Sequence, residues 1–380
     1  MPKLAINGGK PIRTKKFLSQ NPIEQEERDA VQRVLDRGIL TSYRANKDYY
    51  KGDFEIKALV EEFCEMFGWE FAIPCNSATT GLMLSSMCVS TDAPFTVSPF
   101  SLSCSASMPV FAGKNIMFHD VDIDYYSIAD EINGPVVDVA LFGQSCMHNH
   151  TGFFIEDAAQ ALGAEGTTPD IRVHSFVGGK HISAGEGGMM CTNHPGTAER
   201  LRLLVNHAEC INHSRNSSDP MIGGNFRMTE IQAALIRAQL PKFKKRLEIR
   251  RENCNYLSKR FSEMDYLDPP KLWRGPESHS YYCYPFNVKS RYHDPPRNDI
   301  NKAVRAELAN VRIVDGYVEP LYRFPCFPGY SGLRLHNTEE LWKWRLSLIM
   351  DIAYPHTIED MKDIADAYEK VWENREELYG

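Results

Sequence analysis

The chain has 380 residues, of which 43% are hydrophobic and 24% are charged, and its formal net charge at pH 7 is −7. This length exceeds one ordinary hydrophobic core and predicts two packed domains. The acidic balance argues against nucleic acid as the main partner, because a surface that follows a phosphate backbone needs clustered Lys and Arg. No apolar stretch approaches the roughly 18 residues of a membrane span, so we expect no membrane partner either.

Short apolar runs alternate with helical patterns from about residue 54 to residue 192. The runs are apolar on both faces, as buried strands of a mainly parallel sheet are; they are Phe71–Pro74, Phe95–Val97, Ile116–Phe118, Val136–Phe142, Phe153–Ile155, Val173–Val177 and Gly188–Cys191. Between them we predict helices at Glu55–Phe67, Thr79–Met87, Cys104–Phe111 and Thr197–His207. The alternation predicts an open α/β sheet with helices on both faces, whose ligands bind beyond the carboxyl ends of the strands.

A long helical stretch follows, and beyond it the pattern becomes α+β. Thr229 and Gln232 have capping-box spacing at its start, and Pro241 predicts a break before a second helix, Lys242–Met264. The last third predicts a strand and then helices, at Tyr281–Val288, Asp299–Leu308, Glu339–Leu348 and Ile358–Tyr379, with Thr357 as the final N-cap. We therefore expect a large α/β domain with an N-terminal arm over residues 1–250 and a smaller α+β domain over residues 251–380.

The cysteines predict no metal site, and the longest basic run predicts no binding surface. Ten cysteines are scattered singly with no Cys-x-x-Cys, which is typical of reduced thiols in a cytoplasmic protein. Cys146, His148 and His150 lie close together in sequence, but no fourth ligand follows at a recognisable spacing. The longest basic run, Lys242 to Arg251, lies within a helical pattern and is interpreted as a solvated helix face.

Three segments carry residues suited to one chemistry, although each has a structural explanation of its own. Asp157 ends an apolar strand, where an acid is also a common N-cap. Lys180 follows a strand and has glycines on both sides, which permit close approach of a bulky ligand but also occur in flexible surface loops. The segment Cys75-Asn-Ser-Ala78-Thr79-Thr-Gly81 leads from a strand into a helix N-terminus rich in small and hydroxyl residues, as phosphate-binding turns do.

Together the three segments fit pyridoxal 5'-phosphate (PLP), which needs a lysine for its Schiff base, an anion at its pyridine nitrogen and donors for its phosphate. Lys180 and Asp157 suit the first two needs, and Ala78, Thr79 and Ser175 suit the phosphate. A buried carboxylate raises the pKa of the ring nitrogen by charge pairing, and each pKa unit is worth about 1.36 kcal/mol. A nicotinamide dehydrogenase is disfavoured, because no Gly-x-Gly-x-x-Gly follows a strand.

Four motifs occur in a fixed order with compatible gaps. They are Asn76-Ser-Ala-Thr79, Glu156-Asp157-Ala-Ala-Gln160-Ala, Ser175-Phe…Lys180…Gly185-Glu-Gly-Gly and Gly224-Asn225-Phe-Arg227-Met-Thr-Glu. Their order resembles that of the DegT/DnrJ/EryC1/StrS family of sugar aminotransferases, which have the aspartate aminotransferase fold (fold type I). The resemblance extends from about Leu4 through the final helix and implies an α/β fold with a mainly parallel seven-stranded sheet flanked by helices, plus the smaller α+β domain.

The resemblance implies roles for the cofactor-binding residues. Lys180 would form the Schiff base and then act as base and acid in the 1,3-proton shift, and Asp157 would pair with the pyridinium nitrogen. Gln160 would lie near the ring substituents, at the phenolic oxygen. The phosphate would be bound by Ser175, Ala78 and Thr79.

Further roles implied by the resemblance involve a second subunit and the substrate. Asn225 would reach the phosphate of the neighbouring subunit's cofactor, so that a homodimer would complete each site. The segment that contains Tyr317 and Tyr322 resembles the C-terminal loop that lines the sugar site. Either hydroxyl could bind the sugar, and both tyrosines are equally compatible with a place in the core.

The chain departs from the family pattern at two positions. Leu102 occupies the place of an aromatic residue that stacks on the pyridine ring, unless Phe100 takes over that place; a leucine packs without π-stacking, so the cofactor would be held less tightly. Ala78 replaces a common glycine in the phosphate turn. In the family's sugar 3-dehydratases a histidine replaces the lysine, but the five residues from Lys180 to Gly185 have the lysine spacing and leave His181 one position later.

The implied reaction moves an amino group from glutamate or glutamine to a keto-sugar by way of pyridoxamine 5'-phosphate. Acceptors in the family are mostly nucleotide-linked, with keto-cyclitols a minority, which implies a role in amino sugar biosynthesis. Two alternatives remain open at this point: a PLP-dependent sugar dehydratase or another fold-type-I reaction, and a non-catalytic binding protein that keeps the fold.

Overall fold

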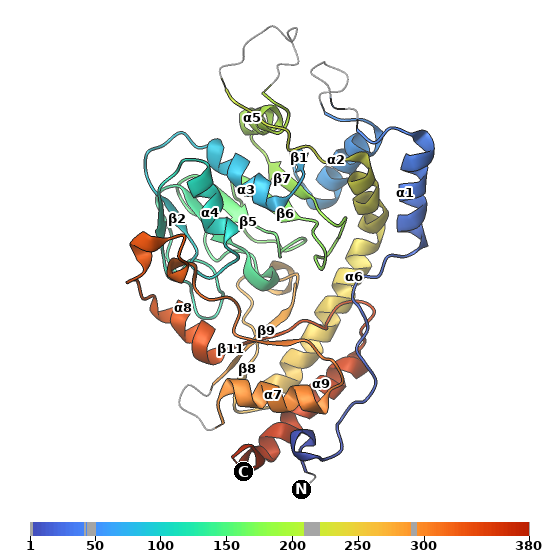
Figure 1. Cartoon of the computed structure of the whole chain (residues 1–380), viewed down its shortest axis with the longest axis vertical. Helices are drawn as coiled ribbons and strands as arrows, with labels where there is room; N and C mark the ends of the chain where they lie inside the picture. The colour runs from blue at the N-terminus through green and yellow to red at the C-terminus, as the bar shows by residue number, and fades with distance from the viewer. Residues whose placement is uncertain (1–2, 42, 44–50, 209–220, 290–294, 380) are drawn as a thin grey trace.

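The computed structural model describes residues 3–41, 43, 51–208, 221–289 and 295–379. Its larger part is built on a seven-stranded sheet in the spatial order β1-β7-β6-β5-β4-β2-β3 (Figure 1). Strand β7 runs antiparallel to both of its neighbours, and the other pairs are parallel. The predicted mainly parallel seven-stranded sheet is thus confirmed, with strands β1 (Phe71–Cys75), β2 (Phe95–Val97), β3 (Ile116–Phe118), β4 (Val136–Val139), β5 (Phe154–Asp157), β6 (Ile171–Ser175) and β7 (Gly188–Thr192).

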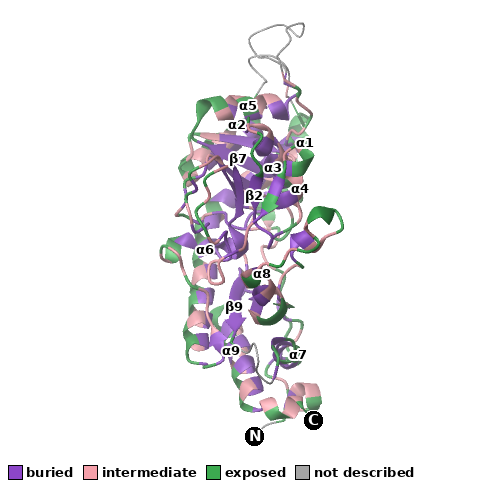
Figure 2. Ribbon diagram, turned by 90° about the vertical axis from the view of Figure 1, so that its left-hand side faces the viewer, coloured by how far each residue is buried: buried purple, intermediate pink, exposed green. Residues whose placement is uncertain are grey.

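Helices cover both faces of this sheet, because its strands are apolar on both sides. On one face lie α3 (Ala78–Met87), α4 (Cys104–Phe111) and α5 (Pro195–Val205), which bury Leu82 and Leu201 against Ile73 and Val173. On the other lie α2 (Phe54–Phe67) and α6 (Glu230–Ser262), and α1 (Gln25–Arg37) packs on the outside of α6. Figure 2 shows the resulting layers, with buried strands between helices whose outer faces are exposed.

Helix α6 is continuous over 33 residues, so the predicted break at Pro241 is wrong. Thr229 and Gln232 do form the predicted capping box at its start. Proline inside a helix removes one hydrogen bond and costs about 3 kcal/mol. The helix passes through it because the buried face continues across the proline, from Ile236 and Leu240 to Phe243 and Leu247.

The smaller part is an antiparallel sheet in the order β10-β11-β9-β8, covered by α7 (Arg297–Glu307), α9 (Ile358–Glu373) and the end of α6. The strands are β8 (Leu267–Asp268), β9 (Tyr284–Val288), β10 (Ile313–Asp315) and β11 (Leu346–Ile349). The N-terminal arm crosses to this part: Leu4 is fully buried in its core, and the backbone of Arg13 hydrogen-bonds to Glu307. The two termini therefore lie at the same end of the molecule (Figure 1).

Four predicted elements have clearly different bounds. The expected helix Glu339–Leu348 is a short helix, α8 (His336–Glu340), a π-turn (Leu341–Arg345) and then β11, because residues 346–349 pair with β9 and β10 on both sides. The strands expected at Val136–Phe142 and Tyr281–Val288 are shorter, since Phe142 and Tyr281 have positive φ angles of 60° and 50°. The final helix ends at Glu373 and is followed by a 3-10 turn, and Thr357 caps it as predicted.

The nine cysteines within the described ranges are all free, and Cys210 lies outside those ranges. None of the helices in the described part of the chain combines the length and the apolarity that crossing a bilayer requires.

Gly188 allows the start of β7 to approach the start of α3. A Cβ atom at this position would lie 2.5 Å from the carbonyl carbon of Ser77 and 2.6 Å from the amide nitrogen of Ala78, both of which are backbone atoms. We predict that Gly188→Ala lowers the free energy of unfolding by about 1–3 kcal/mol, as overpacking does. Gly196→Ala on α5, where nothing lies within 4 Å of the added carbon, should leave stability unchanged or higher. Urea unfolding followed by circular dichroism measures both, and equal midpoints would contradict the close approach.

Candidate active site

The predicted site residues gather at the carboxyl edge of the large sheet. Gly188, at the start of β7, pairs with Cys75 at the end of β1 and with Ser175 at the end of β6, because β7 runs antiparallel to both strands. Asp157 is the last residue of β5, the next strand in the sheet. The loop that carries Lys180 begins directly after β6, so its side chain starts from the same edge.

Asp157 is buried, with 4% of its surface exposed. Its two carboxylate oxygens accept hydrogen bonds from different donors: the Ser105 hydroxyl donates to Oδ2 at 2.6 Å, and the Ala159 amide donates to Oδ1 at 3.2 Å. Burial raises the pKa of Asp157 above its ordinary 3.8, while Ser105, Ala159 and the nearby Lys180 oppose this rise. The carboxylate therefore sits in a place where an additional cationic donor would stabilise it.

Lys180 is half-buried in a loop that its neighbours shape. Gly179 has a φ of 87°, as expected for a glycine beside the lysine, and the carbonyl of Lys180 accepts a hydrogen bond from the Asn21 side chain at 3.1 Å. The Nζ atom lies 4.5 Å from the centre of the Tyr282 ring, and no described carboxylate forms an ion pair with it. Burial lowers the pKa of Lys180 from its ordinary 10.5, and the charge of Asp157 opposes this.

Lys180 and Asp157 share one electrostatic environment. Each contributes to the pKa of the other, and both contribute to the pKa of Cys104, which burial raises to about 12. Thr79, in the first turn of α3, forms a hydrogen bond to the same thiol. The lysine, the carboxylate and the start of α3 therefore lie near one another.

The N-terminus of α3 lies near these residues and has backbone amides that are unpaired within the helix. Ser77 is the N-cap, and its hydroxyl accepts a hydrogen bond from the Thr80 amide at 3.1 Å. The amides of Ala78 and Thr79 come before the first intrahelical donor, so they are oriented outward with the positive end of the helix dipole. Ala78 is buried, Thr79 is exposed, and the half-buried hydroxyl of Ser175 accepts a hydrogen bond from Val177 nearby in sequence.

Gln160 connects the large sheet to the C-terminal part of the chain. Its Oε1 accepts from the amide of Phe142 at 2.9 Å, and its Nε2 donates to the hydroxyl of Tyr317 at 3.0 Å. The Tyr317 ring meets Phe100 and Phe142 edge-on at 5.7 and 5.2 Å. Because its hydroxyl accepts from Gln160, the proton of that hydroxyl remains available for another acceptor.

Two pairs of candidate residues differ in their surroundings: Leu102 and Phe100 differ in exposure, and Tyr322 and Tyr317 differ in their hydrogen bonds. Leu102 is 59% exposed, whereas Phe100 is fully buried and packs on Tyr317. The Tyr322 ring is fully buried in the core of the large sheet, and its hydroxyl donates to Glu339 at 2.7 Å.

Asn225 lies on a segment beside the start of α3, because the carbonyl of the next residue, Phe226, accepts a hydrogen bond from the amide of Asn76 at 2.8 Å. It is exposed and forms an isolated β-bridge with Asn206, whose side chain accepts from Arg227 at 2.7 Å. No described side chain hydrogen-bonds to that of Asn225. An exposed amide held on a braced segment can act on a molecule outside its own chain.

Sequence reasoning missed three residues next to the lysine and the carboxylate: Ser105, Cys104 and Tyr282. Ser105 and Cys104 belong to a hydroxyl-rich run at the start of α4, and that run was the available signal. Tyr282 gave no signal, because it comes from the segment before β9, about a hundred residues further along the chain. Buried Arg250 holds that segment by donating to the carbonyls of Tyr281 and Tyr282 at 2.8 and 3.2 Å.

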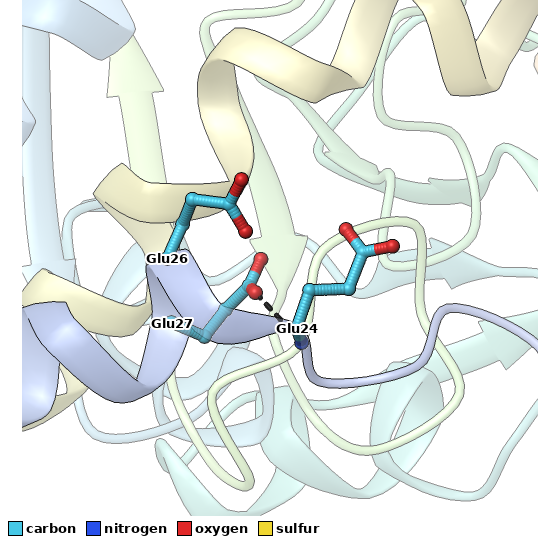
Figure 3. Close-up of side chains that lie close together, drawn as sticks. All are labelled: Glu24, Glu26 and Glu27. Atoms are coloured by element: carbon cyan, nitrogen blue, oxygen red, sulfur yellow. Dashed lines mark hydrogen bonds between the residues drawn. The ribbon is translucent and has the colours of Figure 1, made fainter.

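An acidic cluster at the start of α1 has a different explanation (Figure 3). Glu24, Glu26 and Glu27 are close enough together to hold a cation. The Nζ atom of Lys242 already lies 2.8–3.1 Å from all three carboxylates, and Arg246 pairs with Glu24. The hydrogen bond from Lys242 lowers the pKa of Glu24. The cluster therefore joins α1 to α6 through ion pairs with Lys242 and Arg246.

The residues first considered as a metal cluster are engaged separately. The His148 ring contacts the carbonyl of Ala129, and the His150 ring contacts the amide of Ile132 and the carboxylate of Asp138. The contact with Asp138 ties the segment to β4, and the other two contacts tie it to the loop before β4.

The chain matches known proteins over nearly its whole length. A family model described as the DegT/DnrJ/EryC1/StrS aminotransferase family matches residues 21–368. The UDP-4-amino-4,6-dideoxy-N-acetyl-beta-L-altrosamine transaminase of Campylobacter jejuni (strain 81-176) is 23% identical, over 87% of this chain and 91% of that protein.

Solved structures share the fold. Helicobacter pylori PseC, an aminotransferase involved in the biosynthesis of pseudoaminic acid, has a TM-score of 0.79 and 23% identity over 95% of this chain and 100% of that one. A GDP-4-keto-6-deoxymannose-3-dehydratase, solved with PLP and glutamate trapped in it, has a TM-score of 0.78 and 18% identity over 93% of this chain and 100% of that one. The same fold thus supports two reactions on sugars, and the residues of the site must distinguish them.

The raised pKa of Asp157 predicts how stability depends on pH. In the unfolded chain this carboxyl ionises near 3.8, and in the folded, cofactor-free protein it ionises at higher pH. The wild type therefore loses stability relative to Asp157→Asn as the pH rises through this interval, by about 1.4 kcal/mol for each pKa unit, and the difference stays constant above it. Urea unfolding of both proteins from about pH 4 to about pH 8 tests this. A difference that does not change with pH would contradict the raised pKa.

Proposed function

Because the chain belongs to the DegT/DnrJ/EryC1/StrS aminotransferase family, we propose that it uses PLP on Lys180 to move an amino group from glutamate or glutamine to a keto-sugar. The observation that carries this proposal is the shared environment of Lys180 and Asp157. The residues around them fit the cofactor: an amine, a buried carboxylate with spare acceptor capacity, and an outward-facing helix start. When bound, PLP supplies an aldehyde that takes up the donor's nitrogen and a pyridinium ring that stabilises the negative charge developing beside it.

Lys180 is the proposed nucleophile and proton carrier. An amine attacks a carbonyl only when it is neutral, and burial lowers the pKa of Lys180, which increases the neutral fraction near neutral pH. When the Lys180 amine is free again, it can take the proton from the first carbon of the 1,3-proton shift and return it to the third atom. The face of Tyr282 at 4.5 Å favours the protonated form, but more weakly than an ion pair that would hold the proton on the amine.

Asp157 and the start of α3 are proposed to orient the cofactor. Asp157 would face the ring nitrogen, because each of its oxygens has a single protein donor and can accept another hydrogen bond. The amides of Ala78 and Thr79, with the hydroxyl of Ser175, would bind the phosphate. Leu102, exposed just before the start of α4, would pack on the ring with dispersion forces alone.

Gln160 and Tyr317 are proposed to lie on the substrate side. The Gln160 amide fixes the Tyr317 hydroxyl, whose own proton can then be donated to the phenolic oxygen of the cofactor or to a sugar hydroxyl. Tyr322 was the alternative for the sugar, but its hydroxyl already donates to Glu339, so we favour Tyr317. A nucleotide-linked acceptor is favoured by the activity named for the Campylobacter relative.

The arrangement of His181 favours transamination over dehydration. Its Nε2 lies 2.9 Å from the carbonyl of Ser280, and the ring is buried beside Phe243. His181 is thus engaged elsewhere, which supports Lys180 as the residue that binds the cofactor, in agreement with the lysine spacing of the family. The runner-up function is a PLP-dependent sugar dehydratase on the same fold, or a non-catalytic protein that retains it.

We also propose a cytoplasmic homodimer. The free cysteines of the described residues support a reducing compartment, since disulfides are rare there. Asn225 supports the dimer, because its side chain is exposed and has no hydrogen bond to a described side chain, so it could reach the phosphate in a second subunit.

We predict that the wild type, given glutamate or glutamine and a nucleotide-linked keto-sugar, forms an amino sugar, and that Lys180→Ala lowers this activity by about 10²–10⁴-fold or more. Mass spectrometry distinguishes replacement of oxygen by nitrogen from loss of water, and the second result would favour the dehydratase. Borohydride reduction and peptide mapping should place the cofactor on Lys180 in the wild type and in Lys362→Ala, which removes an exposed lysine on α9. Covalent labelling of Lys180→Ala would refute the assignment.

A mixed dimer tests whether Asn225 acts across the interface. Lys180→Ala and Asn225→Ala should each be impaired alone. When the two are refolded together at equal amounts, action in trans leaves one intact site in each mixed dimer, so about a quarter of wild-type activity should return. Action within one chain would restore nothing, and full activity in a monomer would contradict the shared site.

A further inference from the structure

We propose that Ser105, oriented by Ser101, is a positioning residue that keeps the Asp157 carboxylate ionised and thereby keeps the ring nitrogen of bound PLP protonated. The inference rests on the proposed function for its cofactor but concerns residues outside the motifs. It identifies a buried hydroxyl chain, Ser101–Ser105–Asp157, as the element that sets the charge at the far end of the cofactor site.

The hydrogen-bonded chain from Ser101 through Ser105 to Asp157 is short and buried. The hydroxyl oxygens of Ser101 and Ser105 are 2.9 Å apart, and the Ser105 oxygen is 2.6 Å from Asp157 Oδ2. Ser101 is 2% exposed and Ser105 is 0% exposed, so water does not compete for these bonds. The bond to the carboxylate is in the range of a charge-assisted O–H···O⁻ hydrogen bond.

The number of available protons determines which hydroxyl donates in each of these hydrogen bonds. A serine hydroxyl has one proton to donate, and an ionised carboxylate can only accept. With Asp157 ionised, Ser105 must give its proton to Oδ2, and Ser101 must then donate to Ser105. If Asp157 takes up a proton, this constraint is lifted. The hydroxyl chain in its observed arrangement therefore stabilises the charged form of Asp157 selectively.

The hydroxyls of Ser101 and Ser105 form no other hydrogen bond with the described residues. Ser103, not Ser105, is the N-cap of α4, and the Ser105 hydroxyl contacts only Ser101 and Asp157. Buried serines nearby behave differently: the hydroxyls of Ser85 and Ser86 bond back to carbonyls of their own helix, α3. A buried hydroxyl whose acceptor is a carboxylate, instead of its own helix, points to a role in tuning that carboxylate.

The consequence concerns one proton shared between two groups. The carboxylate and the pyridine nitrogen compete for it, and burial of Asp157 favours its transfer to the carboxylate. The Ser105 hydroxyl lowers the basicity of the carboxylate and so leaves the proton on the ring. Removing the hydroxyl should shift this partition toward the neutral ring by about tenfold or more.

The test uses the full-length protein reconstituted with PLP labelled with ¹⁵N in the ring. In the wild type the ¹⁵N resonance should have the upfield position of a protonated pyridine, and in Ser105→Ala it should move downfield toward the neutral form. Ser105→Thr, which keeps the hydroxyl, should restore the wild-type position. Ser86→Ala is the matched control, because it removes a buried hydroxyl from α3 without touching Asp157. An unmoved resonance in Ser105→Ala would overturn the proposal.

A second measurement separates failure of this inference from failure of the proposed function. In the cofactor-free protein, the infrared band of the protonated carboxyl, identified by subtracting Asp157→Asn, should persist to higher pH in Ser105→Ala than in the wild type. If the wild type binds no PLP on Lys180, the proposed function fails, and this titration still tests the hydroxyl chain. Should Ser105→Ala not fold, Ser101→Ala should shift the titration in the same direction by a smaller amount; an unshifted titration in either folded variant refutes the chain.

Discussion

An amine and a carboxylate that are both poorly solvated, and that lie close enough to influence each other, form the interaction on which this site depends. Burial disfavours the charge on each group, and their mutual attraction partly restores it. The fold brings them together because β5 ends at Asp157 and the loop after the neighbouring strand β6 carries Lys180. The antiparallel strand β7 contributes its first residue, Gly188, to the same edge, which allows the start of α3 to come close. The reactive arrangement is thus a property of strand ends.

The sequence predicted most of this edge, because its information is local. A buried strand that ends in an acid, a lysine between glycines and a strand that leads into a hydroxyl-rich turn can each be recognised within about ten residues, and their order agrees with the family. Tyr282 could not be found in that way, and for Ser105 the hydroxyl-rich run at the start of α4 was a local signal that did not point to Asp157. Their relation to Asp157 and Lys180 depends on how α4 and the segment before β9 pack in three dimensions, which no local pattern encodes.

The errors in secondary structure have the same origin. Pro241 carries a local signal for a break, but the apolar face that continues from Leu240 to Phe243 keeps α6 intact. The predicted helix extended to Leu348, yet the segment from Leu346 to Ile349 becomes an inner strand of the second sheet, because strands on both sides supply its hydrogen bonds. In both cases tertiary packing outweighed a preference worth only a few kcal/mol.

Helix α6 also determines how the molecule can deform. At 1.5 Å per residue its 33 residues extend for roughly 50 Å, from the cover of the first sheet into the core of the second. A rotation of one sheet relative to the other would therefore bend α6 or move one of the sheets along it. Bending is mechanically easiest at Pro241, where one backbone hydrogen bond is already absent. The single proline thus provides a built-in flexure, located next to Lys242, which joins α1 to α6.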